Sequence, residues 1–293
     1  MWISCHIYYE KPIEKLLTEA ILPCIEELIV SKKIRNSFFI RYYEKGYHIR
    51  LRLHFVESIH LEYIKNYVTK ELKTYINHYP SKRTDEYSTD LFPNNSFYFT
   101  EYEKEINRYG GTKAIVIAEK QFALSSLVVL NILKSTNQWT YQDVITKAIY
   151  LNMTFCYSLF GEVESTILFL KFNFKNWLEK VSNFETGDSD VALISMFETD
   201  YQNRKNSLVP SLKLLWLALT SGVEFEEAWM NQWALGMAKI REQIYKVHRN
   251  NSPLFSIFDS YLHMTNNRLG LMNRDESYIS YLVYRSLEEI DGI

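Results

Sequence analysis

Four basic side chains recur at every second position of one predicted strand, within the segment "FFIRYYEKGYHIRLRLHF" (residues 38–55). They are His48, Arg50, Arg52 and His54, and the positions between them are apolar. Successive side chains of a strand point to opposite faces of a sheet, so these four should share one face. Arg41 lies on the preceding predicted strand. Because the turn "EKG" joins the two strands as a hairpin, we expect Arg41 to converge with this face.

This basic strand face has two interpretations. Guanidinium groups bind carboxylates through paired hydrogen bonds, so arginines on a rigid strand can form an anion site. Alternatively, the chain's own acids balance the positive charges, and Glu44, Glu101 and Glu105 are the candidates. The spacing alone favours neither interpretation.

A second candidate is the segment "YEKEINRYGGTKAIVIAEKQF", in which Arg108 and Tyr109 precede two glycines and a predicted helix. Backbone N–H groups at a helix N-terminus attract anions, although Gly-Gly before a helix is usually only a turn. The segment matches neither a P-loop nor a dinucleotide-binding motif. Glu119 lies further along the same predicted helix. A lone carboxylate on an apolar face is more often exposed or salt-bridged than catalytic.

The third candidate is the segment "LHMTNNRLG", in which a histidine precedes two asparagines at helical spacing. His263, Asn266, Asn267 and Gly270 share one face of a helix by this spacing. Histidine is the natural acid or base near neutral pH, and an asparagine beside it can orient the ring. The alternative is a core histidine that is satisfied by local hydrogen bonds.

Composition limits the function classes. The 293 residues carry a net charge of −2, which argues against binding nucleic acid mainly through phosphates. The three cysteines form no CxxC pair, so we expect buried thiols in a reducing compartment, and no pattern calls for a metal or another cofactor. The N-terminus lacks the features of a signal peptide, and no apolar run reaches the roughly 18 residues that a membrane span needs. We therefore expect a cytoplasmic protein.

Strand and helix patterns alternate up to about residue 112. The predicted strands cover residues 2–10, 37–43, 47–55 and 97–103, and the predicted helices cover 12–33 and 61–77. Pro23 should bend or interrupt the first helix. Residues 79–96 form a polar predicted loop. The order β-α-β-β-α-β is that of a split βαβ, or ferredoxin-like, sheet layer.

Helical patterns fill nearly all of the chain from residue 113. They cover residues 114–134, 140–159, 163–181, 188–202, 208–220, 224–248 and 275–290, and a further helix starts at Ser252-Pro253. No Gly-, Ser- or Pro-rich linker separates the two parts. The predicted fold class is therefore α+β, a single domain over residues 1–293 in which a sheet layer (1–112) packs on a helical bundle (113–293).

The three candidate segments together resemble the successive signatures of the thiopeptide-type bacteriocin biosynthesis domain. This is the glutamate-elimination domain at the C-terminus of class I lantibiotic dehydratases, which is also found alone. The opening "WISCHIYYEKPIEKLLTEAILPCIEEL" is similar to the start of that domain, so the resemblance runs from Trp2 to the last helix.

The resemblance implies β-elimination of glutamate from glutamylated Ser or Thr of a ribosomal precursor peptide, which leaves dehydroalanine or dehydrobutyrine. It places the family's catalytic arginines at Arg50 or Arg52 and at Arg108, with glutamate binding as their role, and it places the proton-transferring histidine at His263. The further residues that we expect to bind substrate are Arg41, His48, Tyr109, Glu119 and Asn267.

The resemblance also implies partners and alternatives. Only Met1 precedes the match, so we expect a stand-alone elimination subunit that works with a separate glutamylation subunit, which uses glutamyl-tRNA. A cyclase partner and a homodimer stay open. One alternative function is a formal [4+2] cycloaddition between two dehydroalanines, as in pyridine synthases. The other is a non-catalytic subunit that binds the precursor peptide.

Overall fold

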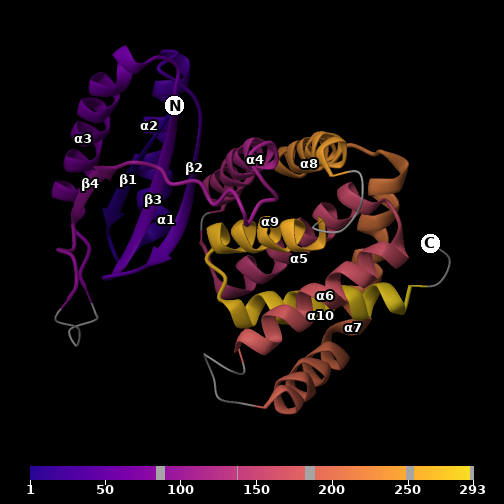
Figure 1. Cartoon of the computed structure of the whole chain (residues 1–293). Coiled ribbons are helices and arrows are strands. Elements are labelled where there is room, and N and C mark those ends of the chain that lie inside the picture. The colour runs from indigo at the N-terminus through magenta and orange to yellow at the C-terminus, as the bar shows by residue number, and fades with distance from the viewer. Residues whose placement is uncertain (84–89, 137, 182–188, 249–253, 291–293) are drawn as a thin grey trace. The chain divides into compact units, whose positions relative to one another are not determined.

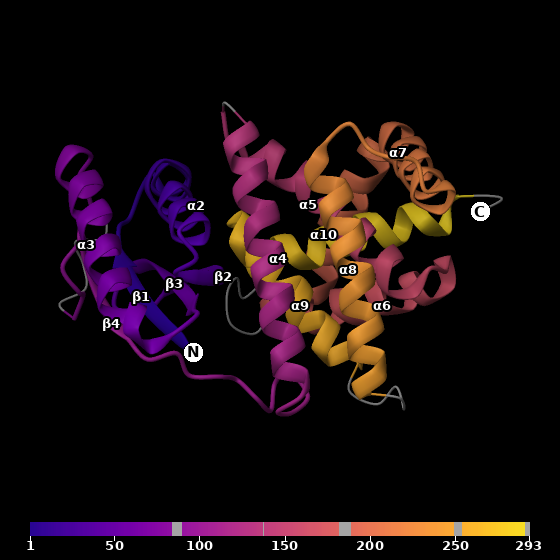
Figure 2. The same ribbon diagram turned by 90° about the horizontal axis from the view of Figure 1, so that it is seen from above.

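Two compact units make up the part of the chain that the structure describes, which is residues 1–83, 90–136, 138–181, 189–248 and 254–290 of a computed structural model (Figures 1 and 2). The sheet unit contains Met1–Glu105 and Phe122–Trp139. The helical unit contains Ile106–Gln121 and Thr140–Ile293.

A four-stranded antiparallel sheet forms the centre of the sheet unit. The strands are β1 (Trp2–Tyr8), β2 (Ile34–Tyr43), β3 (Tyr47–Phe55) and β4 (Ser96–Thr100), in the spatial order β2-β3-β1-β4. The predicted hairpin is confirmed, and Gly46 adopts a φ of 110° in its turn, which glycine tolerates best. The predicted α+β class is confirmed as well.

One face of this sheet is a buried apolar layer. Ile7 and Cys5 on β1 lie opposite Ile49 and Leu51 on β3, and all four side chains are at most 1% exposed. Helices α2 (Leu22–Val30) and α3 (Leu61–His78) belong to the same unit and each buries a row of apolar residues. The odd-numbered positions of β1 and β3 thus form core, which leaves the even-numbered positions on the other face.

The first predicted helix is interrupted before Pro23, as expected. It consists of α1 (Ile13–Lys15), a π-helical segment (Leu16–Ile21) and α2. Pro23 lies in the first turn of α2, where its missing N–H costs no hydrogen bond. A π-helical turn shifts the hydrogen-bond pattern of the backbone, so the chain continues as a helix past the proline.

Six helices lie in the described part of the helical unit between residues 140 and 290. They are α5 (Tyr141–Phe160), α6 (Val163–Val181), α7 (Asp190–Ser221), α8 (Ala228–Val247), α9 (Leu254–Leu269) and α10 (Asn273–Glu288). A capping box between Thr140 and Asp143 starts α5, and Gly161 ends it in the left-handed conformation. Helix α10 runs alongside α6 (Figure 1). The Ser252-Pro253 start predicted for α9 lies outside the described residues.

The prediction of separate helices at 188–202 and 208–220 is wrong, because α7 is continuous over both. The residues between them are polar and mostly exposed, so the sequence lacks the apolar periodicity that would have indicated a helix. Pro210 lies inside α7 and does not end it.

Helix α4 (Ala114–Ser135) contributes residues to both units. It is long and apolar enough to cross a membrane by length and composition, with a mean hydropathy of 1.5, although we expected no such run. In the structure 67% of this stretch is buried, as in the core helix of a globular protein. Ser126 accepts a hydrogen bond from the backbone N–H of Phe39 on β2 at 3.1 Å.

Candidate functional site

The even-numbered positions of β1 and β3 form the predicted basic strand face. In the register, His6 lies opposite Arg50, Ser4 opposite Arg52, and Tyr8 opposite His48. His6 was not predicted to belong here. The alternation of "WISCHIY" could have indicated it, because His6 has the parity of Ser4 and Tyr8.

Arg50 has three partners on or beside this face. Its Nη2 donates to Oε2 of Glu44 at 2.6 Å, and its Nε donates to Nε2 of His48 at 3.1 Å. Its guanidinium lies 3.5 Å from the centre of the Tyr42 ring, a cation–π contact. The sequence interpretation in which Glu44 balances the charge is therefore correct for Arg50.

The histidines of this face are neutral near pH 7. His48 accepts from Arg50 at Nε2, so its proton is on Nδ1, which donates to the Gly46 carbonyl at 3.0 Å. Burial, opposed in part by this hydrogen bond, lowers the pKa of His48. Burial and the nearby Arg50 lower the pKa of His6 to about 3, and burial lowers the pKa of His54. The arginines therefore carry the positive charge, with neutral imidazoles between them.

Arg52 lies among aromatic rings. Its guanidinium is 5.4 Å from the centre of the Phe38 ring and 5.0 Å from that of Tyr102. His54, next along the face, stacks on Trp2 with 4.6 Å between ring centres. Aromatic walls of this kind shield a guanidinium from water and strengthen its interaction with an anion.

The expected convergence of Arg41 with this face is wrong. Arg41 lies opposite Ile49 in the register, so it points to the other side of the sheet from Arg50. There it forms a 2.7 Å ion pair with Glu14 on α1. The register of the hairpin decides which sheet face Arg41 occupies, and the sequence pattern did not reveal that register.

In the helical unit, His263 on α9 is held by a buried carboxylate. Its Nδ1 lies 2.7 Å from Oε1 of Glu276 on α10, and the Glu276 side chain is only 1% exposed. Burial raises the pKa of Glu276, and the positive charge of a protonated His263 opposes this rise. Asn266 donates to the other carboxylate oxygen at 3.4 Å. Since Nδ1 is engaged, Nε2 is the ring nitrogen that can exchange a proton with a substrate.

A second buried acid lies one turn before His263. Asp259 accepts hydrogen bonds from the side chains of Asn173 (2.6 Å), Asn176 (2.9 Å) and Trp177 (3.1 Å) on α6. The Trp177 ring stacks on the His263 ring with 4.2 Å between centres. Burial raises the pKa of Asp259, and these donors oppose the rise. The network fixes both the position and the plane of the imidazole.

Helix α9 also positions the predicted Arg108–Tyr109 segment. Nε of Arg108 donates to Oγ of Ser260 at 3.2 Å, and the Tyr109 ring stacks near Tyr261 at 5.8 Å between centres. Ser260 and His263 are three residues apart, so they lie on neighbouring positions of one helix face. Arg108 and His263 are thus brought to the same side of α9.

The glycines after Tyr109 do not form the anion cradle that the sequence suggested. The N–H of Gly110 donates to the Asn107 carbonyl at 3.3 Å, and that of Gly111 donates to the Ile106 carbonyl at 2.8 Å. Both residues have positive φ, 83° and 103°. The pair is a turn, which was the alternative interpretation.

Two further residues that we expected to bind substrate lie in the helical unit. Glu119 on α4 is buried at 6% exposure, rather than exposed, and Asn267 on α9 is half-buried. Asn266, rather than Asn267, reaches Glu276. Sequence reasoning missed Glu276, Asp259 and Trp177, and also Arg268, which is fully buried and donates to the Met264 carbonyl at 2.6 Å. Glu276 resembled an ordinary first-turn acid, and nothing local indicated its partner.

Across the described ranges, no three His, Cys, Asp or Glu side chains are grouped as metal ligands.

The family described as the lantibiotic biosynthesis dehydratase C-terminal domain matches residues 2–287, nearly the whole chain. The chain belongs to this family. It is also 24% identical over 290 residues to the nisin biosynthesis protein NisB of Lactococcus lactis subsp. lactis. That alignment covers 98% of this chain and 25% of NisB, so the chain spans about a quarter of the relative's length.

Two solved structures show the fold of this dehydratase C-terminal family over nearly the whole chain. The pyridine synthase TbtD from thiomuracin biosynthesis matches with a TM-score of 0.81 at 15% identity, over 99% of this chain and 98% of TbtD. The tRNA-dependent lantibiotic dehydratase MibB from Microbispora sp. 107891 matches with a TM-score of 0.63 at 15% identity, over 97% of this chain and 27% of MibB. At these identities the likeness concerns the fold.

Proposed function

We propose that the chain eliminates glutamate from glutamylated Ser or Thr residues of a ribosomal precursor peptide. The α-proton of the residue is removed, and the electron pair of that C–H bond forms the Cα=Cβ double bond. The Cβ–O bond breaks, and glutamate leaves as a carboxylate. The products are dehydroalanine or dehydrobutyrine and free glutamate. Membership of the dehydratase C-terminal family supports this reaction class.

The observation that carries the proposal is the 2.7 Å contact between His263 and the buried Glu276. A carboxylate on Nδ1 fixes the tautomer and stabilises the imidazolium form, so Nε2 can transfer a proton repeatedly. An ordinary core histidine does not need a second buried acid and a stacked tryptophan to hold its ring. We assign His263 to proton transfer, and the motif "LHMTNNRLG" that contains it supports the assignment.

We assign glutamate binding to Arg50 and Arg52. Glu44, whose side chain is 62% exposed, already places a carboxylate on Arg50. Exposed ion pairs contribute only about 0–1 kcal/mol, so a substrate carboxylate can replace Glu44 at little cost. As the Cβ–O bond breaks, negative charge grows on the leaving group, and a fixed guanidinium stabilises that charge. Arg108 is assigned to the same class of role by its motif.

A formal [4+2] cycloaddition that builds a pyridine is the second candidate function. The structural likeness to TbtD favours it, with a TM-score of 0.81 over almost the full length of both chains. We place elimination first because the arginine and histidine positions that elimination requires are occupied in this chain. A peptide-binding subunit without catalysis is the third interpretation.

The wider assignments accompany this proposal. We infer one elimination-type domain over residues 1–293, with a sheet layer over 1–112 and a helical bundle over 113–293. The spatial order of the strands supports a ferredoxin-like layout of the sheet. The proposed setting is cytoplasmic, and the proposed partners are a glutamylated precursor peptide and a separate glutamylation subunit that uses glutamyl-tRNA.

Mass spectrometry of a glutamylated Ser peptide after incubation with the purified protein tests the reaction. Elimination removes the glutamyl group together with water and releases free glutamate. His263→Ala and Arg52→Ala should each abolish this release while circular dichroism shows that both variants fold. An unchanged glutamylated mass, together with a new pyridine chromophore from a peptide that carries two dehydroalanines, would establish the cycloaddition instead.

A further inference from the structure

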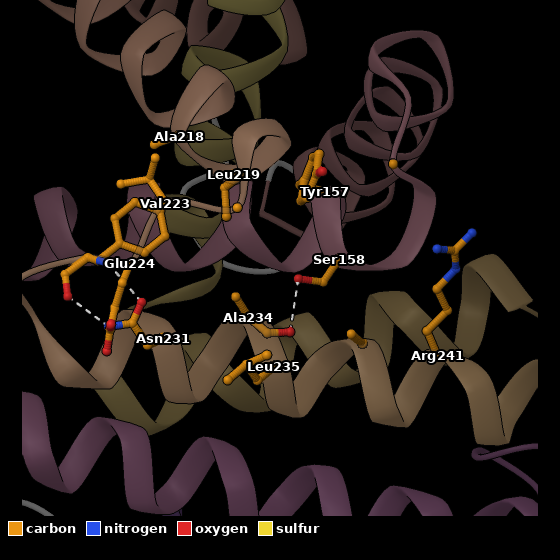
Figure 3. A pocket seen from close by; sticks show the side chains of 14 residues that line it. Tyr157, Ser158, Ala218, Leu219, Val223, Glu224, Asn231, Ala234, Leu235 and Arg241 are labelled. Carbon is orange, nitrogen blue, oxygen red and sulfur yellow. Dashed lines mark hydrogen bonds between the residues drawn. The ribbon is translucent and has the colours of Figure 1, made fainter.

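An open apolar groove lies in the helical unit, where residues of α5, α7 and α8 face one another (Figure 3). Its volume is about 490 Å³, within the range of ligand sites. Tyr157 of α5, Leu219 of α7 and Ala234 of α8 line it, and none of its lining residues was assigned a role in the proposed reaction. The groove is therefore a feature that the proposed reaction does not use.

Small side chains on α8 keep this groove open. Ala234 and Ala238 are four residues apart, so they lie on the same stripe of the helix, and both line the groove. Two larger apolar side chains of the lining are mostly exposed, Val223 at 59% and Leu235 at 66%. Apolar side chains gathered in an exposed groove mark a surface that binds another molecule.

Charges of opposite sign flank the apolar part. Glu224 and Arg241 both line the groove, and Figure 3 shows them at opposite ends of it. Within the described ranges neither side chain has an ion-pair partner, and Arg241 contacts only the Tyr245 ring at 5.8 Å. Glu224 follows the C-terminus of α7, which Gly222 caps. Since a helix C-terminus carries partial negative charge, that end of the groove favours a basic group.

The length of the groove can be worked out from α8. Asn231 anchors the Glu224 end, because it donates to the Phe225 carbonyl at 2.7 Å and accepts from the Phe225 N–H at 2.9 Å. Arg241 follows Asn231 by ten residues, which is about 15 Å of helix. Four or five residues of extended chain span about the same distance.

We propose that this groove binds a short extended peptide segment that has a basic residue at the Glu224 end, apolar residues in the middle and an acidic residue at the Arg241 end. The segment belongs to the precursor peptide, outside the residue that reacts, and in this respect the inference rests on the proposed function. Such a site raises the local concentration of the peptide without touching the reacting atoms.

Methyl NMR titration with three synthetic pentapeptides tests the charge pattern. The peptides are Lys-Leu-Val-Leu-Asp, its Lys…Lys analogue and its Asp…Asp analogue, each acetylated and amidated. The wild-type protein should bind the mixed peptide about three- to tenfold more tightly than either analogue, since each exposed ion pair contributes a small increment. The methyl groups of Ala234, Ala238 and Leu235 should shift, while the exposed Leu168 on α6 should not.

Charge substitutions should then change the preference predictably. Glu224→Lys makes both ends positive and should select the Asp…Asp peptide, and Arg241→Glu makes both ends negative and should select the Lys…Lys peptide. The proposal would be overturned if both variants bound the three peptides in the same order of affinity as the wild-type protein.

A steric pair completes the test. Ala238→Trp should fill the groove and remove the methyl shifts, whereas Ala192→Trp, at an exposed position of α7, should leave them intact. Both substitutions should leave glutamate release from a minimal glutamylated peptide unchanged. Peptide binding without glutamate release would retain the groove and reject elimination. Glutamate release without methyl shifts would reject the groove and retain elimination.

Discussion

Replacement of Glu276 by glutamine tests directly whether the buried carboxylate supports proton transfer by His263. The substitution keeps the size and shape of the side chain and removes its negative charge. The glutamine carbonyl can still accept from Nδ1 of His263, where the carboxylate now lies at 2.7 Å. If the side-chain amide of Asn266 turns over, the glutamine NH2 group can donate to Oδ1 of Asn266, a buried oxygen for which the structure shows no partner. The variant should therefore fold with nearly unchanged stability.

The magnitude follows from the charge that is lost. A hydrogen bond to a charged group contributes about 1.5–3 kcal/mol. Two unit charges about 4 Å apart interact by about 4 kcal/mol at an effective dielectric constant of 20, which is an upper bound. Because each 1.36 kcal/mol changes a rate tenfold, glutamate release should slow by about 10- to 100-fold in Glu276→Gln. His263→Ala should lose more, since it removes the transferring group itself.

The assay is single-turnover release of glutamate from a glutamylated Ser peptide, with substrate affinity measured separately. The rate of the chemical step should fall while the affinity stays close to that of the wild type. Glu198→Gln is the matched control, because Glu198 also contacts α10, through Tyr281 and Arg285, but lies outside the His263 network. It should release glutamate at the wild-type rate.

A folded Glu276→Gln variant with the wild-type rate would refute this reasoning. Such a result would mean that Glu276 is already neutral in the active protein, as its burial alone would favour. Urea denaturation of both variants provides the control for folding. Loss of activity together with a large loss of stability would instead show that Glu276 is needed only for the stability of the fold.

Three further predictions concern individual residues. Arg50→Ala should abolish glutamate release, whereas Arg41→Ala, which removes the ion pair with Glu14 on the other sheet face, should retain it and only lower the unfolding midpoint in urea. Gly110→Ala should destabilise the protein by about 1–3 kcal/mol in urea denaturation, since its φ is 83° and a Cβ there would lie 2.6 Å from Nε2 of His248. Gly111→Ala should lower the free energy of unfolding by less, because its φ is 103° and no atom lies within 4 Å of the added Cβ. The His6 ring should stay neutral in NMR titration until well below pH 5, because its pKa is lowered to about 3, and its contribution to stability should be lost as the pH falls from about 6.5 towards 3. The first prediction would be contradicted if Arg50→Ala retained glutamate release. The second would be contradicted if both glycine substitutions lowered the unfolding free energy equally, and the third if His6 titrated near pH 6.5 as in a short peptide.

Local sequence patterns were sufficient for most of the elements. Alternation along residues 47–55 predicted β3 with its observed bounds, and the apolar spacing of residues 163–181 predicted α6 equally well. These patterns work because burial on one side of a strand or helix repeats at a fixed period. They failed over residues 203–207, where polar residues on an exposed part of α7 carry no such repeat.

The sequence by itself determined which residue types were available for chemistry and that the chain belongs among the dehydratase C-terminal domains, since motif order and spacing depend only on the linear chain. The tertiary structure decided which of these residues share an environment. Arg41 lies outside the basic strand face because the hairpin register places it opposite Ile49. The histidines of that face are neutral because burial beside arginines lowers their pKa. Glu276 became the partner of His263 only because the fold brings this position of α10 within 2.7 Å of His263 on α9. Such contacts depend on packing between elements, for which a single sequence holds no periodic signal.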